Sequence, residues 1–243
     1  MKEVNNYLPT LRQKWSEVPA GGDKRITTET LLSLSDNDLL TFWNDVFRRD
    51  TEGEGFNIRG WYHCLYTDFL KEKSVLDVGS GLGISTIAFA RAGAHVTFVD
   101  IHQTNLAVIE RLCGILKISS VSFLYLDALQ SLETLPYDFD VITAIGSMHH
   151  APFEIIKAEA AELIKHLKIN GRWLQFAYPK SRWQKEGSPQ FEDWGNMTDG
   201  LGTPYAEWYD TPKLLSLLAP AQLDLVFYYE WHNQDFNWFD LVL

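Results

Sequence analysis

A nine-residue segment at positions 75–83 carries the residue types best suited to hold a ligand. It reads Val-Leu-Asp-Val-Gly-Ser-Gly-Leu-Gly, and a helix-like stretch follows from Ile84. Strand, glycine-rich turn and helix form the layout in which backbone N–H groups near a helix N-terminus bind a nucleotide-like molecule. Glycine lets the ligand approach the backbone and lets the turn adopt positive φ. The segment therefore predicts a ligand-binding turn.

The spacing of the glycines and two nearby acids separate two classes of ligand. A dinucleotide site would need its third glycine at position 84, where the chain has Ile84. Asp77 precedes the first glycine and would repel pyrophosphate, but it suits a ligand with a positive charge. Asp100 ends the next apolar run, where a carboxylate can accept hydrogen bonds from ribose hydroxyls. The pattern favours a positively charged nucleoside.

This turn, with its acids, resembles motif I of the class I S-adenosylmethionine-dependent methyltransferases. The resemblance covers residues from about 60 to 243 and implies S-adenosyl-L-methionine as cofactor and S-adenosyl-L-homocysteine as product. It implies that the turn holds the amino-acid end of the cofactor, that Asp77 contacts the ammonium group indirectly, and that Asp100 binds the ribose. Ile101 would then lie against adenine, and Asp127 would accept its amino group.

Further cofactor contacts are expected where the later strands end, because ligands of open α/β sheets lie off the carboxyl ends of the strands. Arg59 could pair with the cofactor carboxylate, although a surface arginine is the alternative. The predicted cofactor-binding residues are Arg59, Asp77, Gly79, Ser80, Gly81, Gly83, Asp100, Ile101, Asp127, Ala128 and Gly146.

From residue 74 onward the sequence predicts alternating strands and helices. Strands are expected at 74–79, 94–99, 121–126, 139–145 and 171–178, and helices at 84–92, 103–117, 153–167 and near 211–219. Two later apolar runs, at 223–229 and 236–243, indicate a hairpin. Five parallel strands and an antiparallel pair correspond to the seven-stranded, Rossmann-like α/β sheet of this family, with helices on both faces.

The length of 243 residues suits one α/β domain with a small addition. We expect an N-terminal helical cap or lid at 1–55 and a methyltransferase domain at 56–243. The elements expected before the first core strand are a helix at about 7–16, a loop through Gly21 and Gly22, a helix starting at Ser35, a flexible joint at 51–56 and a helix at 59–70. An insertion at about 180–210 is too long for a simple connection, so we expect it to bind substrate.

Composition excludes several classes of partner. The formal net charge is −11 and no basic stripe is present, which argues against nucleic acid. No apolar run is long enough to span a membrane and no signal peptide is evident, so a cytoplasmic location is expected. Cys64 and Cys113 lack metal-site or redox-pair spacing and are expected to be free, buried thiols. The oligomeric state stays open between monomer and homodimer.

Methyl transfer needs alignment of the reactants and removal of a proton from the nucleophile. His149 and His150 follow the fourth strand, where an imidazole could act as the base. The alternative is that one of them only shapes the pocket. We take His149 as the lead base, with His150 and His232 as alternatives. The segment after the fourth strand has no clustered carboxylates, so no metal is expected.

Aromatic residues alternate with acids in the insertion and in the last hairpin. Such a surface suits a cationic amine, through cation–π attraction of about 0.5–2 kcal/mol per contact, or a sugar that stacks on the rings. The segments 202–210 and 236–241 resemble a bacterial subgroup often associated with surface-polysaccharide or specialised-metabolite pathways, which favours a hydroxyl of a small or sugar-like acceptor. The predicted substrate residues are Tyr178, Trp183, Glu207, Trp208 and Asp210.

Three alternatives to an O-methyltransferase remain. Within the same chemistry, the protein could methylate the nitrogen of a cationic amine metabolite. From another class, it could be a non-catalytic cofactor-binding partner subunit. An NAD-dependent oxidoreductase is the more distant possibility, because the glycine spacing departs from the dinucleotide pattern.

Overall fold

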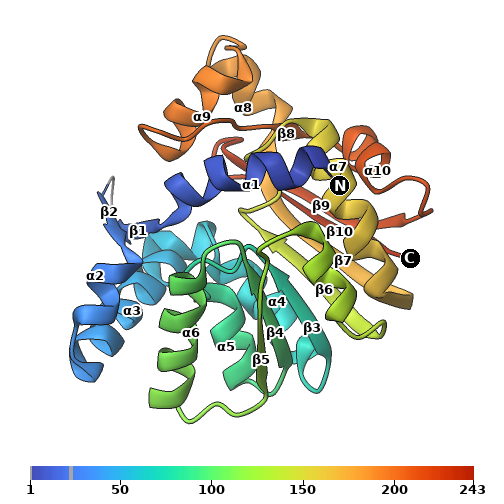
Figure 1. Ribbon diagram of the computed structural model, residues 1–243. Helices are drawn as coiled ribbons and strands as arrows, with labels where there is room; N and C mark the ends of the chain where they lie inside the picture. Colours follow the sequence, from blue (N-terminus) through green and yellow to red (C-terminus); the bar gives the residue numbers. More distant parts are fainter. Residues whose placement is uncertain (1, 22–23) are drawn as a thin grey trace. The chain divides into compact units, whose positions relative to one another are not determined.

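The computed structural model describes residues 2–21 and 24–243, which form two compact units (Figure 1). One unit consists of residues 15–125, and the other combines the N-terminal segment up to Lys14 with residues 126–243. Gly22, which belongs to the predicted loop, lies outside the described residues. The division into a cap at 1–55 and a catalytic domain at 56–243 stays a prediction.

The unit of residues 15–125 contains three parallel strands in the order β5-β4-β3. These are β3 (Ser74–Val78), β4 (His95–Asp100) and β5 (Val121–Tyr125). The helices α4 (Gly60–Leu70), α5 (Ile84–Arg91) and α6 (Gln103–Ile115) accompany them (Figure 1). Val75, Leu76 and Val78 are all buried, as expected for a strand covered on both faces. The predicted strands and helices of this unit are confirmed to within three residues at each end.

The segment before these strands differs in part from the sequence prediction. It contains β1 (Glu17–Gly21), β2 (Lys24–Thr27), α2 (Thr28–Ser33), α3 (Asp36–Thr51) and the 3₁₀ helix η1 (Gly53–Asn57). The predicted start of α3 is confirmed, because the Ser35 side chain accepts a hydrogen bond from Asp38 N. The predicted loop is wrong, since β1 and β2 pair as an antiparallel hairpin. Pro19 obscured this strand in the sequence; it lies where the register shifts, a position at which a strand tolerates proline.

The predicted flexible joint at 51–56 is also wrong, because η1 orders it. Gly55 packs so closely that a Cβ there would lie 1.8 Å from the Arg49 carbonyl oxygen. The two cysteines are free, as predicted, but only Cys113 is buried. Cys64 is exposed because the buried side chains Tyr62, Tyr66 and Leu70 follow the opposite face of α4. In the described ranges, no helix is both long and apolar enough to cross a membrane.

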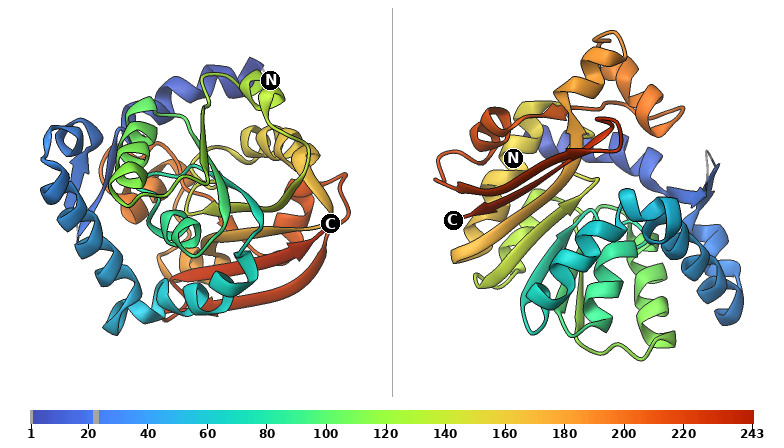
Figure 2. Two further views of the ribbon diagram at one scale, coloured as in Figure 1. Left: turned by 90° about the horizontal axis from the view of Figure 1, so that it is seen from below. Right: turned by 180° about the vertical axis from the view of Figure 1, so that it is seen from behind.

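The second unit contains four main strands in the order β6-β7-β10-β9. They are β6 (Phe139–Ile145), β7 (Leu167–Pro179), β9 (Asp224–Trp231) and β10 (Phe236–Val242). β6 and β7 are parallel, whereas β10 pairs antiparallel with both β7 and β9, and Figure 2 shows the two red strands beside β7. The predicted C-terminal hairpin is therefore confirmed. The remaining elements are the helices α1 (Lys2–Trp15), η2 (Leu129–Thr134), α7 (Phe153–Leu163), η3 (Ile164–His166) and α10 (Thr211–Leu218).

Helix α1 is anchored to the loop that follows β5. Arg12 Nη2 donates to the Leu126 carbonyl at 2.8 Å and to the Asp127 carbonyl at 2.6 Å. Asn5 Oδ1 accepts from Leu129 N at 2.9 Å. These contacts fix the backbone that carries Asp127, a predicted adenine contact.

The predicted insertion is ordered by a small core of its own. It contains α8 (Lys180–Lys185), α9 (Phe191–Asp199) and the two-residue strand β8 (Trp208–Tyr209), which pairs with the end of β7 (Figure 1). Tyr178, Trp194 and Ala206 are buried together, and Trp183, Phe191, Trp208 and Phe236 pack against them. Aromatic burial on this scale holds the segment beside the end of β7.

Candidate active site

The glycine turn after β3 has the backbone that the sequence predicted. Gly79, Gly81 and Gly83 have φ values of 71°, 54° and 61°, a conformation that favours glycine. A Cβ built on Gly81 would meet no described atom within 4 Å, so the turn borders open space. Gly83 is the N-cap of α5 and makes no side-chain capping bond. The turn therefore offers a cradle for a ligand at a helix N-terminus.

Two buried acids flank this turn. Asp77 Oδ2 accepts from Thr86 Oγ1 at 2.8 Å. Asp100, only 4% exposed, accepts from Gly81 N at 2.9 Å on one oxygen and from His102 N at 2.8 Å on the other. Burial raises the pKa of Asp100 to about 6, while these N–H donors oppose the rise. Asp100 is thus tied to the glycine turn itself and is mainly ionised at neutral pH.

Asn105 is a residue of this site that the sequence did not reveal. Its Nδ2 donates to Asp100 Oδ1 at 3.1 Å and to the Trp15 carbonyl at 3.1 Å. Its Oδ1 is buried and has no hydrogen-bond partner in the described parts of the chain. A buried polar oxygen without a partner fits a ligand hydroxyl or amine. The only sequence signal was its position on the helix after Asp100.

A second group of donors lies where α4 and α5 begin. Arg59 Nη1 lies 3.3 Å from Tyr62 Oη and 3.4 Å from Ser85 Oγ, and those two hydroxyls lie 2.9 Å apart. Arg59 Nε is 3.6 Å from Asp50, which offsets part of its charge. A guanidinium with two hydroxyls suits a carboxylate ligand. The sequence identified Arg59 but not its two partners, which are brought to it by packing of the helices.

The other predicted cofactor residues occupy strand ends. Ile101 follows β4 and is half-buried. Asp127 is exposed and accepts a hydrogen bond from Ser131, which lowers the pKa of Asp127. Ala128 is the N-cap of η2, and Gly146 follows β6 with φ of 72°. Their roles toward a cofactor stay predictions.

The histidine pair after β6 is buried. His149 is 1% exposed, and neither of its ring nitrogens has a hydrogen-bond partner among the described residues. The centres of the His149 and His150 rings are 4.2 Å apart. Burial, with the neighbouring charges of His150 and Arg182, places the pKa of His149 well below its usual value. His149 is therefore neutral at physiological pH and able to accept a hydrogen bond or a proton.

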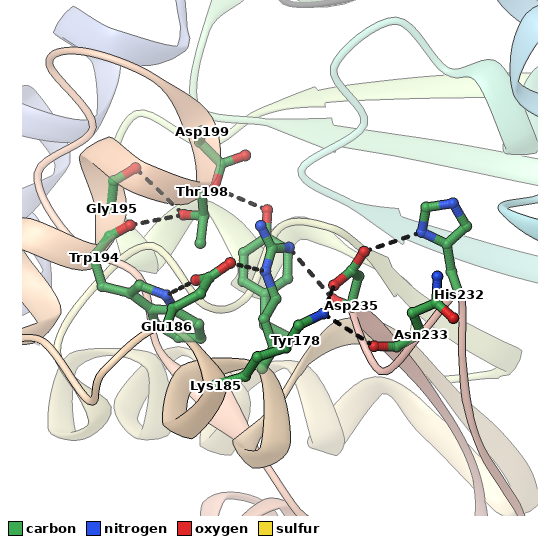
Figure 3. A network of polar contacts seen from close by, with 11 residues as sticks. Tyr178, Lys185, Glu186, Trp194, Gly195, Thr198, Asp199, His232, Asn233 and Asp235 are labelled. Carbon is green, nitrogen blue, oxygen red and sulfur yellow. Dashed lines mark hydrogen bonds and ion pairs between the residues drawn. The ribbon is translucent and has the colours of Figure 1, made fainter.

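The end of α9 brings a carboxylate to this pair. Asp199 Oδ2 accepts from Tyr178 Oη at 2.9 Å (Figure 3). The same oxygen lies 3.9 Å from His150 Nδ1. His150 Nδ1 also lies 3.3 Å from the Tyr205 carbonyl. The ligand-type atoms of His149, His150 and Asp199 all lie within 4.8 Å of one another. The sequence missed Asp199 because its side chain meets the pair only through folding of the insertion.

Among the predicted substrate residues, Glu207 and Trp208 lie around Lys213. Glu207 is 1% exposed, accepts from Tyr205 Oη at 3.1 Å and forms a close ion pair with Lys213. Lys213 Nζ lies 3.8 Å from the centre of the Trp208 ring, and Lys180 Nζ lies 4.9 Å from it. Trp208 Nε1 is buried without a hydrogen-bond partner in the described structure. An indole N–H of this kind suits a hydrogen bond to an oxygen atom of the methyl acceptor.

Three further predicted residues have identifiable partners. Trp183 Nε1 donates to the Pro189 carbonyl at 2.9 Å. Asp210 caps α10 by accepting from the Lys213 backbone N–H, so its carboxylate supports the helix. The side chain of His232 is 41% exposed in the turn between β9 and β10, and its Nδ1 lies 3.2 Å from Asp235 (Figure 3). The structure thus gathers His149, His150, Tyr178 and Asp199, while His232 pairs with Asp235.

Replacing Lys213 by methionine is expected to lower the free energy of unfolding by about 2–4 kcal/mol, because buried Glu207 would lose its cationic partner. Chemical denaturation would measure the loss at neutral pH. Burial already raises the pKa of Glu207, so the loss should shrink as the pH falls and Glu207 takes up a proton. Lys185→Met is the control, because the exposed Lys185 lies 3.7 Å from Asp235 and should change stability little. Equal stability of the two variants would contradict this account.

Comparison with known proteins agrees with this geometry. Residues 75–171 match the family described as "Methyltransferase domain". The "Ubiquinone biosynthesis O-methyltransferase" of Pseudomonas paraeruginosa is 40% identical over 83 residues, which are 34% of this chain and 35% of that protein. That of Bordetella parapertussis is 34% identical over 110 residues, or 44% and 43% of the two chains. The chain thus spans about a third to two fifths of these curated relatives.

Solved structures resemble the chain over a greater length. The N-methyltransferase NodS of Bradyrhizobium japonicum, crystallised with S-adenosylhomocysteine, matches 88% of this chain and 95% of its own, with a TM-score of 0.58 and 15% identity. The 1,6-didemethyltoxoflavin-N1-methyltransferase of Burkholderia thailandensis matches 93% and 98%, with a TM-score of 0.56 and 16% identity. These likenesses confirm the predicted Rossmann-like fold. The family match over residues 75–171 supports the predicted resemblance to the class I S-adenosylmethionine-dependent methyltransferases.

Proposed function

We propose that this protein transfers a methyl group from S-adenosyl-L-methionine to a hydroxyl group of a small or sugar-like molecule. The observation that carries the proposal is the glycine turn after β3, fastened to the buried Asp100 and open at Gly81. The family match, the O-methyltransferases among the relatives and the structural neighbours crystallised with S-adenosylhomocysteine support it. A cytoplasmic location and a small-molecule acceptor, rather than a nucleic acid, belong to the proposal.

The residues of the 15–125 unit fit such a cofactor. Arg59, with the hydroxyls of Tyr62 and Ser85, would bind its carboxylate. The turn and Asp77 would hold its amino end, and Asp100 would accept hydrogen bonds from both ribose hydroxyls. Asn105, whose Oδ1 has no hydrogen-bond partner among the described residues, would help to hold the ribose. When bound, the cofactor supplies a methyl group attached to a positively charged sulfur.

The histidine pair gives the protein a means to activate a hydroxyl. A hydroxyl is a weak nucleophile until its proton is accepted. His149 is neutral and buried, neither of its ring nitrogens has a hydrogen-bond partner among the described residues, and the unprotonated nitrogen can accept that proton. His149 is therefore the proposed base. Tyr178, Trp183, Glu207 and Trp208 are the proposed acceptor-binding residues, with Trp208 Nε1 as a donor to an acceptor oxygen.

Methylation of a cationic amine is the second candidate, but the aromatic rings already carry cations of the protein. Lys213 and Lys180 contact the Trp208 ring, and the Arg182 guanidinium lies 4.6 Å from the centre of the Tyr178 ring. A ligand cation would have to displace these groups or compete with their charge. The arrangement therefore favours a neutral hydroxyl acceptor.

A binding test and a transfer test address the proposal in sequence. S-adenosylhomocysteine at about a hundred times its Kd should stabilise the protein by about 2.7 kcal/mol in thermal unfolding, whereas NAD should have no effect. Methyl-labelled cofactor would then be incubated with nucleotide sugars, glycans and amines. Label is expected in a hydroxyl-bearing acceptor. Stabilisation by NAD and not by S-adenosylhomocysteine would contradict the proposed cofactor. Label found only in amines would contradict O-methylation. Binding without methyl transfer would indicate the non-catalytic partner subunit.

A further inference from the structure

The insertion between β7 and α10 places a carboxylate beside the histidine pair. Asp199 is the last residue of α9, and its side chain is only 14% exposed. Its Oδ2 lies 3.9 Å from His150 Nδ1, and its nearest oxygen lies within 4.8 Å of a His149 ring nitrogen. A negative charge is therefore close to both imidazoles in a region with little solvent.

We infer that Asp199 is a positioning residue for the histidine base: its carboxylate stabilises the positive charge that the pair acquires when His149 accepts the proton of the acceptor hydroxyl. This inference rests on the proposed function and deepens it. It assigns the end of α9, and with it part of the insertion, to the proton transfer rather than to acceptor binding.

The carboxylate is itself held in place. Tyr178 Oη donates to Asp199 Oδ2 at 2.9 Å (Figure 3). The centre of the Tyr178 ring lies 4.6 Å from that of the His149 ring. The Tyr178 side chain therefore contacts both Asp199 and His149. Because β7 carries Tyr178 and α9 carries Asp199, two separate elements fix this arrangement.

Charged side chains on α8 and α9 lie near the pair. Arg182 on α8 acts on His149 with a positive charge, and Asp199 on α9 supplies a negative one beside His150. Burial and Arg182 both oppose a positive charge on His149. Asp199 acts in the opposite sense, so the pair would take up a proton less readily without it.

The methyl transfer moves charge onto this pair. The acceptor oxygen would form a bond to the methyl carbon while the carbon–sulfur bond breaks, and the electron pair of that broken bond would stay on sulfur. The hydroxyl proton passes to an imidazole nitrogen. The positive charge is thereby transferred from sulfur to the histidine pair, where Asp199 compensates it, and the proton later leaves to solvent. A carboxylate next to a histidine base has this role in hydrolase triads.

The same three side chains have the composition of a metal site with two histidines and one carboxylate. Three contacts favour a proton over a metal ion. Tyr178 already donates to Asp199 Oδ2, His150 Nδ1 lies within hydrogen-bond distance of the Tyr205 carbonyl, and Arg182 adds a positive charge nearby. Metal dependence is therefore an outcome that would overturn the inference.

Nitrogen-15 NMR of histidine-labelled protein, without cofactor or acceptor, tests the inference directly. Asp199→Asn is expected to lower the pH midpoint of proton uptake by the pair by about one unit or more, because it removes a charge about 4 Å away. Tyr178→Phe should lower it less and serves if Asp199→Asn fails to fold. Asp193→Asn, on an exposed position of the same helix, should leave the midpoint unchanged. An unchanged midpoint in both test variants, or no proton uptake before unfolding in the wild type, would overturn the inference.

Kinetics with an acceptor from the transfer screen give a second readout. Asp199→Asn should lower kcat about a hundredfold with KM changed less than about threefold, since the variant affects proton transfer more than binding. Loss of wild-type activity in EDTA, restored by Zn²⁺, would overturn the inference in favour of a metal centre. Failure of the proposed function is distinguishable, because the NMR midpoint needs neither cofactor nor methyl transfer.

Discussion

Asp100→Asn is expected to weaken the binding of S-adenosylhomocysteine by about a hundredfold or more, because two ribose hydroxyls lose a charged acceptor at about 1.5–3 kcal/mol each. The amide would also turn an NH₂ group toward Gly81 N or His102 N, which are donors themselves. Isothermal titration calorimetry would measure the change in Kd. Asp68→Asn, on the exposed face of α4, is the matched control and should bind as the wild type does.

The pH dependence of binding distinguishes this role from a purely structural one. The pKa of Asp100 is raised to about 6 by burial, and under the proposed function the ionised form would accept from the ribose. Affinity should be constant above about pH 7 and fall about tenfold per unit below pH 6, a dependence that Asp100→Asn should abolish. For stability the sign is opposite, since a raised carboxyl pKa stabilises the fold at low pH and that contribution is lost as pH rises through 6. A Kd for S-adenosylhomocysteine that stays constant between pH 5 and 8 would contradict the proposed contact between Asp100 and the ribose.

His149→Ala is expected to lower kcat by about 10²- to 10⁴-fold with little change in KM, because the alanine cannot accept the hydroxyl proton. Steady-state kinetics with the acceptor found by the transfer screen would measure both constants. Added imidazole should restore part of the rate, which a folding defect would not allow. His95→Ala, exposed at the start of β4, is the control.

Two outcomes would contradict the role of His149 in catalysis. A loss of kcat in His232→Ala as large as in His149→Ala would indicate that His232, in the β9–β10 turn, is the base. A small effect of His149→Ala, together with large effects of Trp208 substitutions, would indicate an amine acceptor, since a neutral amine attacks without a base.

The sequence predicted the features that depend on neighbouring residues. The glycine turn, the start of α3 at Ser35 and the C-terminal hairpin all follow from local spacing, and the structure confirms them. It also indicated that 180–210 is more than a connection, although not that α8, α9 and β8 order it. Cys64 could have been placed correctly, because Tyr62 and Tyr66 already mark the buried face of α4.

The features that the sequence could not predict depend on distant contacts. Asp199 looks like an exposed helix end until folding brings it to His150, 49 positions earlier. Ser85 looks like an ordinary first-turn residue of α5 until Tyr62 and Arg59 pack beside it. Lys213 likewise covers Trp208 only in the folded chain. In each case, long-range packing rather than local pattern decides which side chains meet.

The pairing of Trp208 with Tyr178 and of Tyr209 with Pro179 has a consequence for changing the specificity of the proposed methyltransferase. The segment 180–207 leaves the end of β7 and returns at β8, which pairs with the end of β7. Its two ends therefore lie close together, and exchanging it alters loop-closure entropy only slightly. A chimera that receives this segment from a related methyltransferase, and keeps both β7 and α10, should still fold. Under the proposed function, acceptor preference would be exchanged with this segment, provided that the incoming segment carries an aspartate at the position of Asp199, while the unit of residues 15–125 stays unchanged.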